Sequence, residues 1–155
     1  MAVVETERHG QVLVVRMNRP ERLNALNTEM RTELARTWTE FRHSKELEVA
    51  IFTGTGRGFC AGEDMKESLQ KGAPGGERPA IEDPFMTGTL EKPVIAAVNG
   101  FAMGGGFMLV ERTDLRLAVQ TYLASTMVDF QSAKSGNLMF TLRGTTAPQD
   151  GTQPR

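Results

Sequence analysis

Two glycine-centred loops, each following an apolar run rich in β-branched residues, constrain the fold of this chain more than any other feature. The first loop, FCAGED, covers residues 59–64 and follows the run VAIF at residues 49–52. The second, NGFAMGGG, covers residues 99–106 and follows VIAAV at residues 94–98. Such runs are typical of buried strands. Turns at two strand ends can aim two backbone N–H groups at one point, which stabilises a developing oxyanion without a side chain and points to acyl chemistry on a carbonyl.

A third motif, NRPERLNAL at residues 18–26, precedes the two loops. In this order the three motifs resemble the crotonase superfamily, whose enoyl-CoA hydratases and isomerases hold an acyl-CoA thioester in a backbone oxyanion hole. The resemblance extends over about residues 3–119. It implies an α/β fold of the ClpP/crotonase type, a spiral of strand–strand–helix units, and a role in fatty-acid or related acyl-CoA metabolism.

The hydrophobic periodicity predicts strands alternating with helices, which indicates an α/β layer with helices packed on a sheet. Residues 28–42 are expected to form a helix because Met30, Leu34, Trp38 and Phe41 share one face. Asn27 and Thr28 are its candidate caps. The remaining expectations are a hairpin of residues 3–7 and 12–17, strands at 47–52, 94–98 and 115–119, a short helix at 66–70, a flexible loop at 72–78 and a strand followed by a helix across 93–112.

We predict two regions, a crotonase-like N-terminal core at residues 1–119 and a divergent, partly disordered tail at residues 120–155. Ser, Thr, Gln, Gly and Pro dominate the tail, and such a composition cannot bury enough apolar surface to order itself. The resemblance implies that family members continue here with more of the sheet and with helices that close the site and build trimers. The chain is therefore expected to be a truncated crotonase fold without that trimer contact.

Charge and cysteine content exclude several function classes. The 18 basic and 19 acidic side chains give a net charge of −1, which provides no attraction for nucleic acid or an anionic membrane. The N-terminal sequence MAVVE lacks the features of a signal peptide, and no apolar run approaches the length of a membrane span, so we expect a cytoplasmic protein. The single cysteine, Cys60, excludes an internal disulfide and forms no metal cluster with the distant His9 and His43. We expect no metal and no separate cofactor, since coenzyme A is part of the substrate.

The resemblance assigns the two oxyanion donors to the backbone N–H groups of Glu63, which follows Ala-Gly, and of Gly105, the middle glycine of the triplet. A thioester carbonyl gains negative charge during the reaction, and two preorganised donors stabilise the resulting enolate. Position 105 is expected to require glycine, because the thioester approaches the backbone so closely that a side chain would be in the way. The alternative interpretation of the triplet is a tight packing contact between a helix start and a strand.

The resemblance also implies coenzyme A contacts, largely through backbone groups. Arg19, Arg22 and Lys66 are candidates for phosphate contacts, and the alternative for each is a solvated surface charge. Cys60 is expected to pack as a small residue rather than to act as a nucleophile, because no general base accompanies it. The full set of expected coenzyme A contacts is Arg22, Asn24, Ala25, Leu26, Cys60, Ala61, Gly62, Asp64, Met65 and Lys66.

The chain departs from the family at the acid–base positions. Hydratases of the family place one glutamate three residues after the middle glycine and another twenty residues further along, and here those positions are Met108 and Val128. Neither side chain transfers protons. The nearest carboxylates are Glu111 and Asp129, which are candidate acid–base groups. The alternative for Glu111 is a charged helix end.

Two function classes therefore remain. The first is an acyl-CoA hydratase or isomerase, which the motif series favours. The second is a non-catalytic or truncated crotonase-fold acyl-CoA binder, which the two missing glutamates favour for this polypeptide. Thioester hydrolysis or decarboxylation on the same scaffold is a third possibility, because it uses the same donors with different acid–base residues.

Overall fold

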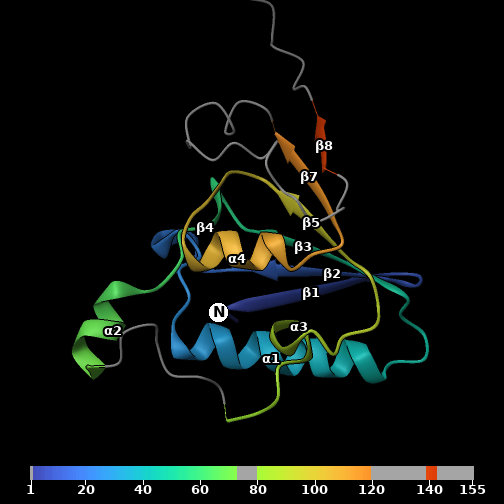
Figure 1. Ribbon diagram of the computed structural model, residues 1–155, viewed down its shortest axis with the longest axis horizontal. Coiled ribbons are helices and arrows are strands. Elements are labelled where there is room, and N and C mark those ends of the chain that lie inside the picture. The colour runs from blue at the N-terminus through green and yellow to red at the C-terminus, as the bar shows by residue number, and fades with distance from the viewer. Residues whose placement is uncertain (1, 73–79, 120–138, 143–155) are drawn as a thin grey trace, which may run out of the picture.

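A six-stranded sheet forms the centre of the computed structural model, which describes residues 2–72, 80–119 and 139–142 (Figure 1). The strand order is β1–β2–β3–β5–β7–β8. The first two strands pair antiparallel, and every later neighbour pairs parallel. The strands are β1 (Val4–His9), β2 (Val12–Met17), β3 (Val49–Gly54), β5 (Val94–Val98), β7 (Leu115–Val119) and β8 (Met139–Leu142).

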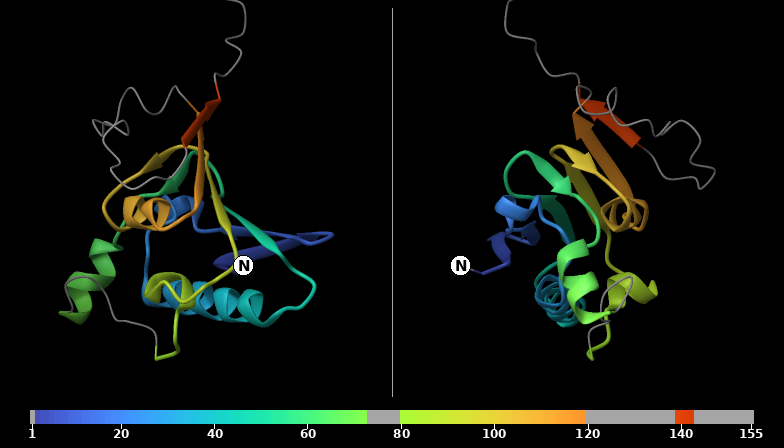
Figure 2. Two further views of the ribbon diagram at one scale, coloured as in Figure 1. Left: turned by 45° about the vertical axis from the view of Figure 1, so that its right-hand side comes forward. Right: turned by 90° about the vertical axis from the view of Figure 1, so that its left-hand side faces the viewer.

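A second, two-stranded sheet pairs β4 (Gly58–Cys60) parallel with β6 (Phe101–Ala102). These strands carry the two glycine loops, so their pairing brings the loops together. Figures 1 and 2 show α3 lying beside α1, and α2 standing apart from the main body beyond the first turns of α1. The helices are η1 (Pro20–Arg22, a 3-10 helix), α1 (Thr28–His43), α2 (Met65–Lys71), α3 (Pro84–Thr87) and α4 (Gly105–Glu111).

Helix α1 is held at both ends by side-chain hydrogen bonds. The side chain of Asn27 caps its start by accepting a hydrogen bond from the N–H of Met30 at 2.9 Å. At its end, Lys92 donates to the carbonyl oxygens of Phe41, Ser44 and Leu47. These carbonyls lie in or just beyond the last turn, where backbone acceptors lack helical partners. Lys92 therefore ties the start of β5 to the end of α1.

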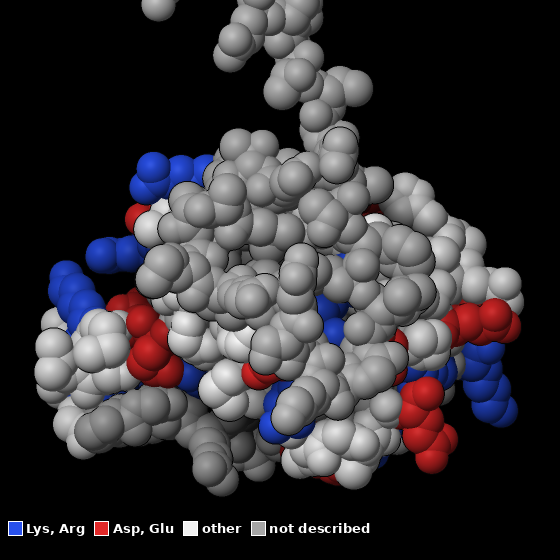
Figure 3. All heavy atoms as spheres, turned by 45° about the horizontal axis from the view of Figure 1, so that its top comes forward, with Lys and Arg blue, Asp and Glu red and all other residues white. Residues whose placement is uncertain are grey.

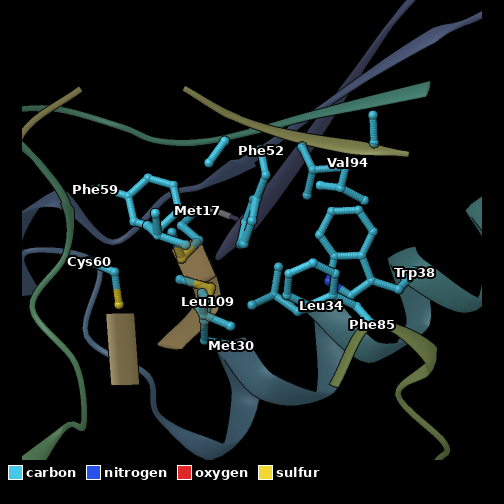
Figure 4. Packing of buried hydrophobic residues seen from close by; sticks show 14 of the residues in the cluster. Met17, Met30, Leu34, Trp38, Phe52, Phe59, Cys60, Phe85, Val94 and Leu109 are labelled. Atoms are coloured by element: carbon cyan, nitrogen blue, oxygen red, sulfur yellow. The ribbon is translucent and has the colours of Figure 1, made fainter. Parts of the chain in front are cut away.

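The core lies between the sheet and α1 and is built around Trp38, which is fully buried. The Trp38 ring stacks on Phe85 of α3, with centroids 5.0 Å apart, and meets Phe52 of β3 edge-on at 5.2 Å. Figure 4 shows Phe52 and Val94 pointing from the sheet toward Trp38, while Leu109 of α4 lies on the side of Met30 and Cys60. One continuous apolar cluster thus joins the sheet, α1, α3 and α4.

The structure confirms the predicted hairpin, the helix beginning at Thr28 with Asn27 as its cap, and the strands ending at Val98 and Val119. The short helix predicted at residues 66–70 is α2. Five elements were not predicted, namely η1, β4, α3, β6 and β8, and each has at most four residues, too few to show a period.

The tail also contributes to the main sheet, because β8 lies within residues 120–155 and pairs with β7. The division at residue 119 stays a prediction. The predicted flexible loop falls almost wholly on residues 73–79, outside the described residues. No helix in the described residues combines the length and apolar character that crossing a membrane requires.

Phe85→Ala tests the aromatic cluster. Removing a nearly buried ring that stacks on Trp38 leaves a cavity between α3 and α1, so we expect the free energy of unfolding to fall by about 3–5 kcal/mol. Urea unfolding followed by far-ultraviolet circular dichroism measures this. Ile81→Ala, at an exposed apolar position, is the control, with an expected loss under about 0.5 kcal/mol. Equal losses in the two variants would contradict the packing described here.

Candidate functional site

The two glycine loops lie directly against each other. The N–H of Met103 donates to the carbonyl of Cys60 at 3.0 Å. Gly62 has φ of +96°, and a Cβ at this position would lie 2.7 Å from the Met103 carbonyl oxygen and 3.3 Å from the Gly105 nitrogen. Both the backbone conformation and the lack of space require glycine here.

The packing interpretation of the glycine triplet applies to Gly106, and the donor interpretation of Gly105 stays a prediction. A Cβ at Gly106 would lie 2.3 Å from the Cys60 carbonyl oxygen, so Gly106 makes the tight packing contact between the start of α4 and β4. A Cβ at Gly105 would instead meet a methyl group of Leu26 at 3.3 Å and the Glu63 nitrogen at 3.9 Å. The backbones of Gly105 and Glu63 are therefore immediate neighbours.

The N–H groups of Glu63 and Gly105, which we call the donor pair, have no hydrogen-bond acceptor within the described residues. The N–H groups of the residues that follow are paired: Asp64 donates to the Leu26 carbonyl at 3.1 Å, and Gly106 donates to the Met103 carbonyl at 2.8 Å. Two adjacent unpaired donors can both donate to one oxygen atom that carries negative charge.

The motif at residues 18–26 supports the first of these loops through the backbone. The N–H of Ala61 donates to the Leu23 carbonyl at 3.0 Å, and the N–H of Leu26 donates to the Gly62 carbonyl at 2.7 Å. With the bond from Asp64 to Leu26, these contacts form a short parallel pairing between the two segments. The peptide unit that carries the Glu63 N–H is thereby held at its Gly62 carbonyl.

Asn24 stabilises an otherwise unfavourable backbone in this motif. Leu23 and Asn24 have φ of 53° and 55°, in the left-handed region that asparagine tolerates better than most residues. The fully buried Asn24 side chain accepts from the N–H of Arg19 and donates to the carbonyls of Thr55 and Gly58, all within 3.0 Å. The Asn24 backbone is also paired, because its N–H donates to the Arg19 carbonyl and its carbonyl accepts from the Cys60 thiol.

Arg19 joins two of the sequence motifs as an ion pair rather than lying free for a phosphate. Its guanidinium donates to the Asp64 carboxylate at 3.0 Å and to the Ala25 carbonyl at 2.6 Å, and both charged side chains are 13% exposed. Burial acts to raise the pKa of Asp64, but hydrogen bonds from Arg19 and from the N–H of Glu67 hold it below its usual value. Asp64 also caps the start of α2.

The Glu63 carboxylate is paired with Arg31 in the first turn of α1 and accepts a hydrogen bond from Ser68 of α2 at 2.9 Å. Sequence reasoning missed both partners. The sequence did indicate that Glu63 needs a cationic partner, because a carboxylate beside two buried loops has to be paired. The choice of Arg31 among many arginines was not readable from the sequence.

The predicted coenzyme A contacts fall into two groups. Arg22, Met65 and Lys66 are exposed, and Ala61 and Asp64 are partly buried. Asn24, Ala25, Leu26, Cys60 and Gly62 are buried. Burial raises the pKa of the Cys60 thiol to about 11, which agrees with the prediction that it is a packing residue. The coenzyme A contacts themselves stay a prediction.

The acid–base candidates lie on and beyond α4. Met108 is one turn after Gly105 and 50% exposed. Glu111 is the exposed last residue of α4, and its backbone carbonyl accepts a hydrogen bond from Arg116. The adjacent Asp114 carboxylate accepts from the N–H of Val94 at 2.7 Å. Val128 and Asp129 lie outside the described residues.

Charged side chains of both signs are interspersed on the face shown in Figure 3, so its described part has no extended basic surface. Among the described residues, no three His, Cys, Asp or Glu side chains gather as metal ligands.

Comparison with known proteins identifies the family. The family model described as enoyl-CoA hydratase/isomerase matches residues 7–130, well over half of the chain. The chain belongs to the enoyl-CoA hydratase/isomerase family of the crotonase superfamily. The match continues past Val119, where the resemblance based on motifs ends.

Relatives and solved structures agree with this assignment. Enoyl-CoA hydratase EchA19 of Mycobacterium tuberculosis is 39% identical over 132 residues, covering 76% of this chain and 49% of that protein. Mevalonyl-coenzyme A hydratase sidH of Aspergillus fumigatus is 42% identical over 111 residues, covering 69% and 41% respectively. A crystal structure of enoyl-CoA hydratase from M. tuberculosis H37Rv matches with a TM-score of 0.68 and 34% identity, covering 77% of this chain and 46% of that one. The chain spans about half or less of the length of these relatives.

Asn24→Ala tests whether this side chain supports the site. The substitution removes three hydrogen bonds, and only the Gly58 carbonyl keeps a second side-chain donor, from Asn99. We therefore expect the free energy of unfolding to fall by about 2–4 kcal/mol. Chemical denaturation with Trp38 fluorescence as the probe measures the loss. Asn18→Ala is the matched control, because the Asn18 side chain bonds only to exposed partners, Ala2 and Glu5. A loss no larger than that of the control would show that the Asn24 contacts do not stabilise the motif.

Proposed function

We propose that this chain binds an acyl-CoA thioester with the thioester carbonyl oxygen between the N–H groups of Glu63 and Gly105. The observation that carries the proposal is the donor pair itself, two neighbouring backbone N–H groups without an acceptor in the described protein. Membership of the enoyl-CoA hydratase/isomerase family supplies the ligand class. One relative, the short-chain-enoyl-CoA hydratase of Clostridium acetobutylicum, has an acyl-CoA substrate in its name.

The donor pair acts on charge that develops at the carbonyl oxygen. When the α-proton leaves, or when a nucleophile adds to the β-carbon, the thioester becomes an enolate and its oxygen becomes more negative. Donors fixed before the reaction stabilise this enolate more than the uncharged ground state. The Glu63 carboxylate does not oppose this effect, because Arg31 neutralises its charge. Coenzyme A enters as part of the substrate, and exposed Arg22 and Lys66 remain the candidates for its phosphates.

A second candidate function, acyl-CoA binding without hydration, is supported by Met108. This residue stands where hydratases of the family carry a glutamate, and a thioether cannot accept or donate the proton of water. Glu111 and Asp129 remain the candidate replacements. Hydration by this chain is therefore expected to be residual, while thioester binding does not require an acid–base group.

Gly105→Pro tests the donor pair. Proline removes one N–H, and proline is well tolerated at the first position of a helix. We expect the affinity for crotonyl-CoA to fall by about fivefold or more, since one hydrogen bond to the carbonyl is lost. The affinity for free coenzyme A, which has no thioester carbonyl, should not change. Isothermal titration calorimetry measures both constants.

Circular dichroism must first show that the Gly105→Pro variant is folded. If proline disturbs the fold, Gly105→Ala replaces it, because its Cβ would meet a flexible Leu26 methyl at 3.3 Å and lie 3.9 Å from the Glu63 nitrogen, beside the donor pair. Unchanged crotonyl-CoA affinity in folded Gly105→Pro would mean that the donor assignment is wrong, and unchanged affinity in Gly105→Ala, which keeps the N–H, would mean that the thioester does not approach this backbone closely.

Met108→Glu tests the second candidate. A general acid–base group contributes about 10²–10⁴ in rate, so the new carboxylate, one helical turn from Gly105, should raise crotonyl-CoA hydration by about tenfold or more. Loss of the ultraviolet absorbance band of the conjugated enoyl thioester measures hydration. Met103→Glu is the matched control, because Met103 is equally exposed but precedes α4. Robust hydration by the unchanged chain, lost on Glu111→Gln or Asp129→Asn, would overturn this interpretation and identify the substitute base.

A further inference from the structure

The loop that carries the Glu63 N–H continues directly into α2, a helix with little apolar anchoring. Ser68 is the buried residue of α2, whereas Met65 and Leu69 are 62% and 77% exposed. Figures 1 and 2 show this helix apart from the main body, beside the beginning of α1. Apolar packing of α2 therefore does not fix the loop.

Polar contacts with the first turn of α1 hold α2 instead of apolar packing. Glu67 accepts hydrogen bonds from the N–H and the hydroxyl of Thr28, at 2.7 and 3.2 Å. These contacts hold the middle of α2. The Arg31–Glu63 pair is the contact that reaches the donor residue itself, and its two side chains are 21% and 19% exposed.

The peptide unit between Gly62 and Glu63 needs this second restraint. Glycine imposes few steric limits on the rotation of an adjacent peptide. A hydrogen bond from the N–H of Leu26 holds the carbonyl of this unit. On the other side, the Glu63 side chain is held by Arg31 from α1 and by Ser68 from α2. The Nε of Arg31 is buried and has no acceptor among the described residues, so Glu63 is the partner on which its guanidinium depends.

We propose that Arg31 is a positioning residue, which fixes the direction of the Glu63 N–H by anchoring the Glu63 side chain. The inference rests on the proposed function, because it has meaning only if that N–H receives the thioester carbonyl. Arg31 itself does not contact the substrate. It acts through Glu63, and its effect is confined to the part of the ligand that the donor pair contacts.

The test compares the affinities of the 155-residue chain for crotonyl-CoA and for free coenzyme A, since crotonyl-CoA alone presents the thioester carbonyl. Arg31→Gln is expected to lower the ratio of these affinities by about threefold or more while the Kd of free coenzyme A stays constant. Arg31→Lys keeps the cation and should restore most of the ratio. Arg36→Gln is the matched control, because Arg36 pairs with Glu33 on the surface of the same helix, and its ratio should equal that of the unchanged chain.

The outcomes separate positioning from general stability and from failure of the proposed function. If Arg31→Gln weakens both ligands by one factor, or leaves the ratio unchanged, Arg31 is not a positioning residue. If this variant does not fold, Ser68→Ala takes its place, because it removes a hydrogen bond to Glu63 without changing a charge. A smaller fall in the ratio then supports the inference, and an unchanged ratio overturns it. An unchanged chain that does not prefer crotonyl-CoA overturns the proposed function, and the inference with it.

Discussion

The rest of the site depends on the parallel backbone pairing between residues 23–26 and residues 61–64. Three hydrogen bonds join these segments and hold the peptide that carries the Glu63 N–H. The pairing requires left-handed backbone at Leu23 and Asn24, and the buried Asn24 side chain offsets that cost with three hydrogen bonds. Because Asp64 both pairs with Arg19 and begins α2, the position of that helix also follows from this contact.

Periodicity in the sequence predicted the elements that are long enough to show it. Strands β2, β3 and β5 bury every second residue and α1 buries one helical stripe, and the apolar periodicity of the sequence reflects this burial. Strands β4 and β6 have three and two residues, so pairing partners rather than their own sequence define them. Strand β8 lies in a polar segment whose composition predicts no strand.

The glycine loops and their order were enough to predict the family, but not the contacts between motifs. Arg19 and Asp64 are 45 residues apart, and nothing local indicates that one neutralises the other. Arg19 was considered as a phosphate ligand because a guanidinium makes charge-assisted hydrogen bonds to phosphate, and the local sequence does not show that Asp64 takes this role. Arg31 was overlooked for a related reason, since it lies outside the apolar stripe of α1 and its partner comes from a different motif.

The close backbone approach at Gly62 and Gly106 means that some positions of the site tolerate substitution and others do not. A side chain at either glycine would collide with main-chain oxygen atoms, which cannot move aside. Residue 108 carries its half-exposed side chain away from that contact, so mutation can exchange it without disturbing the two N–H groups. A lineage built on this scaffold can therefore gain or lose proton-transfer groups in single steps, and each intermediate keeps the same folded backbone.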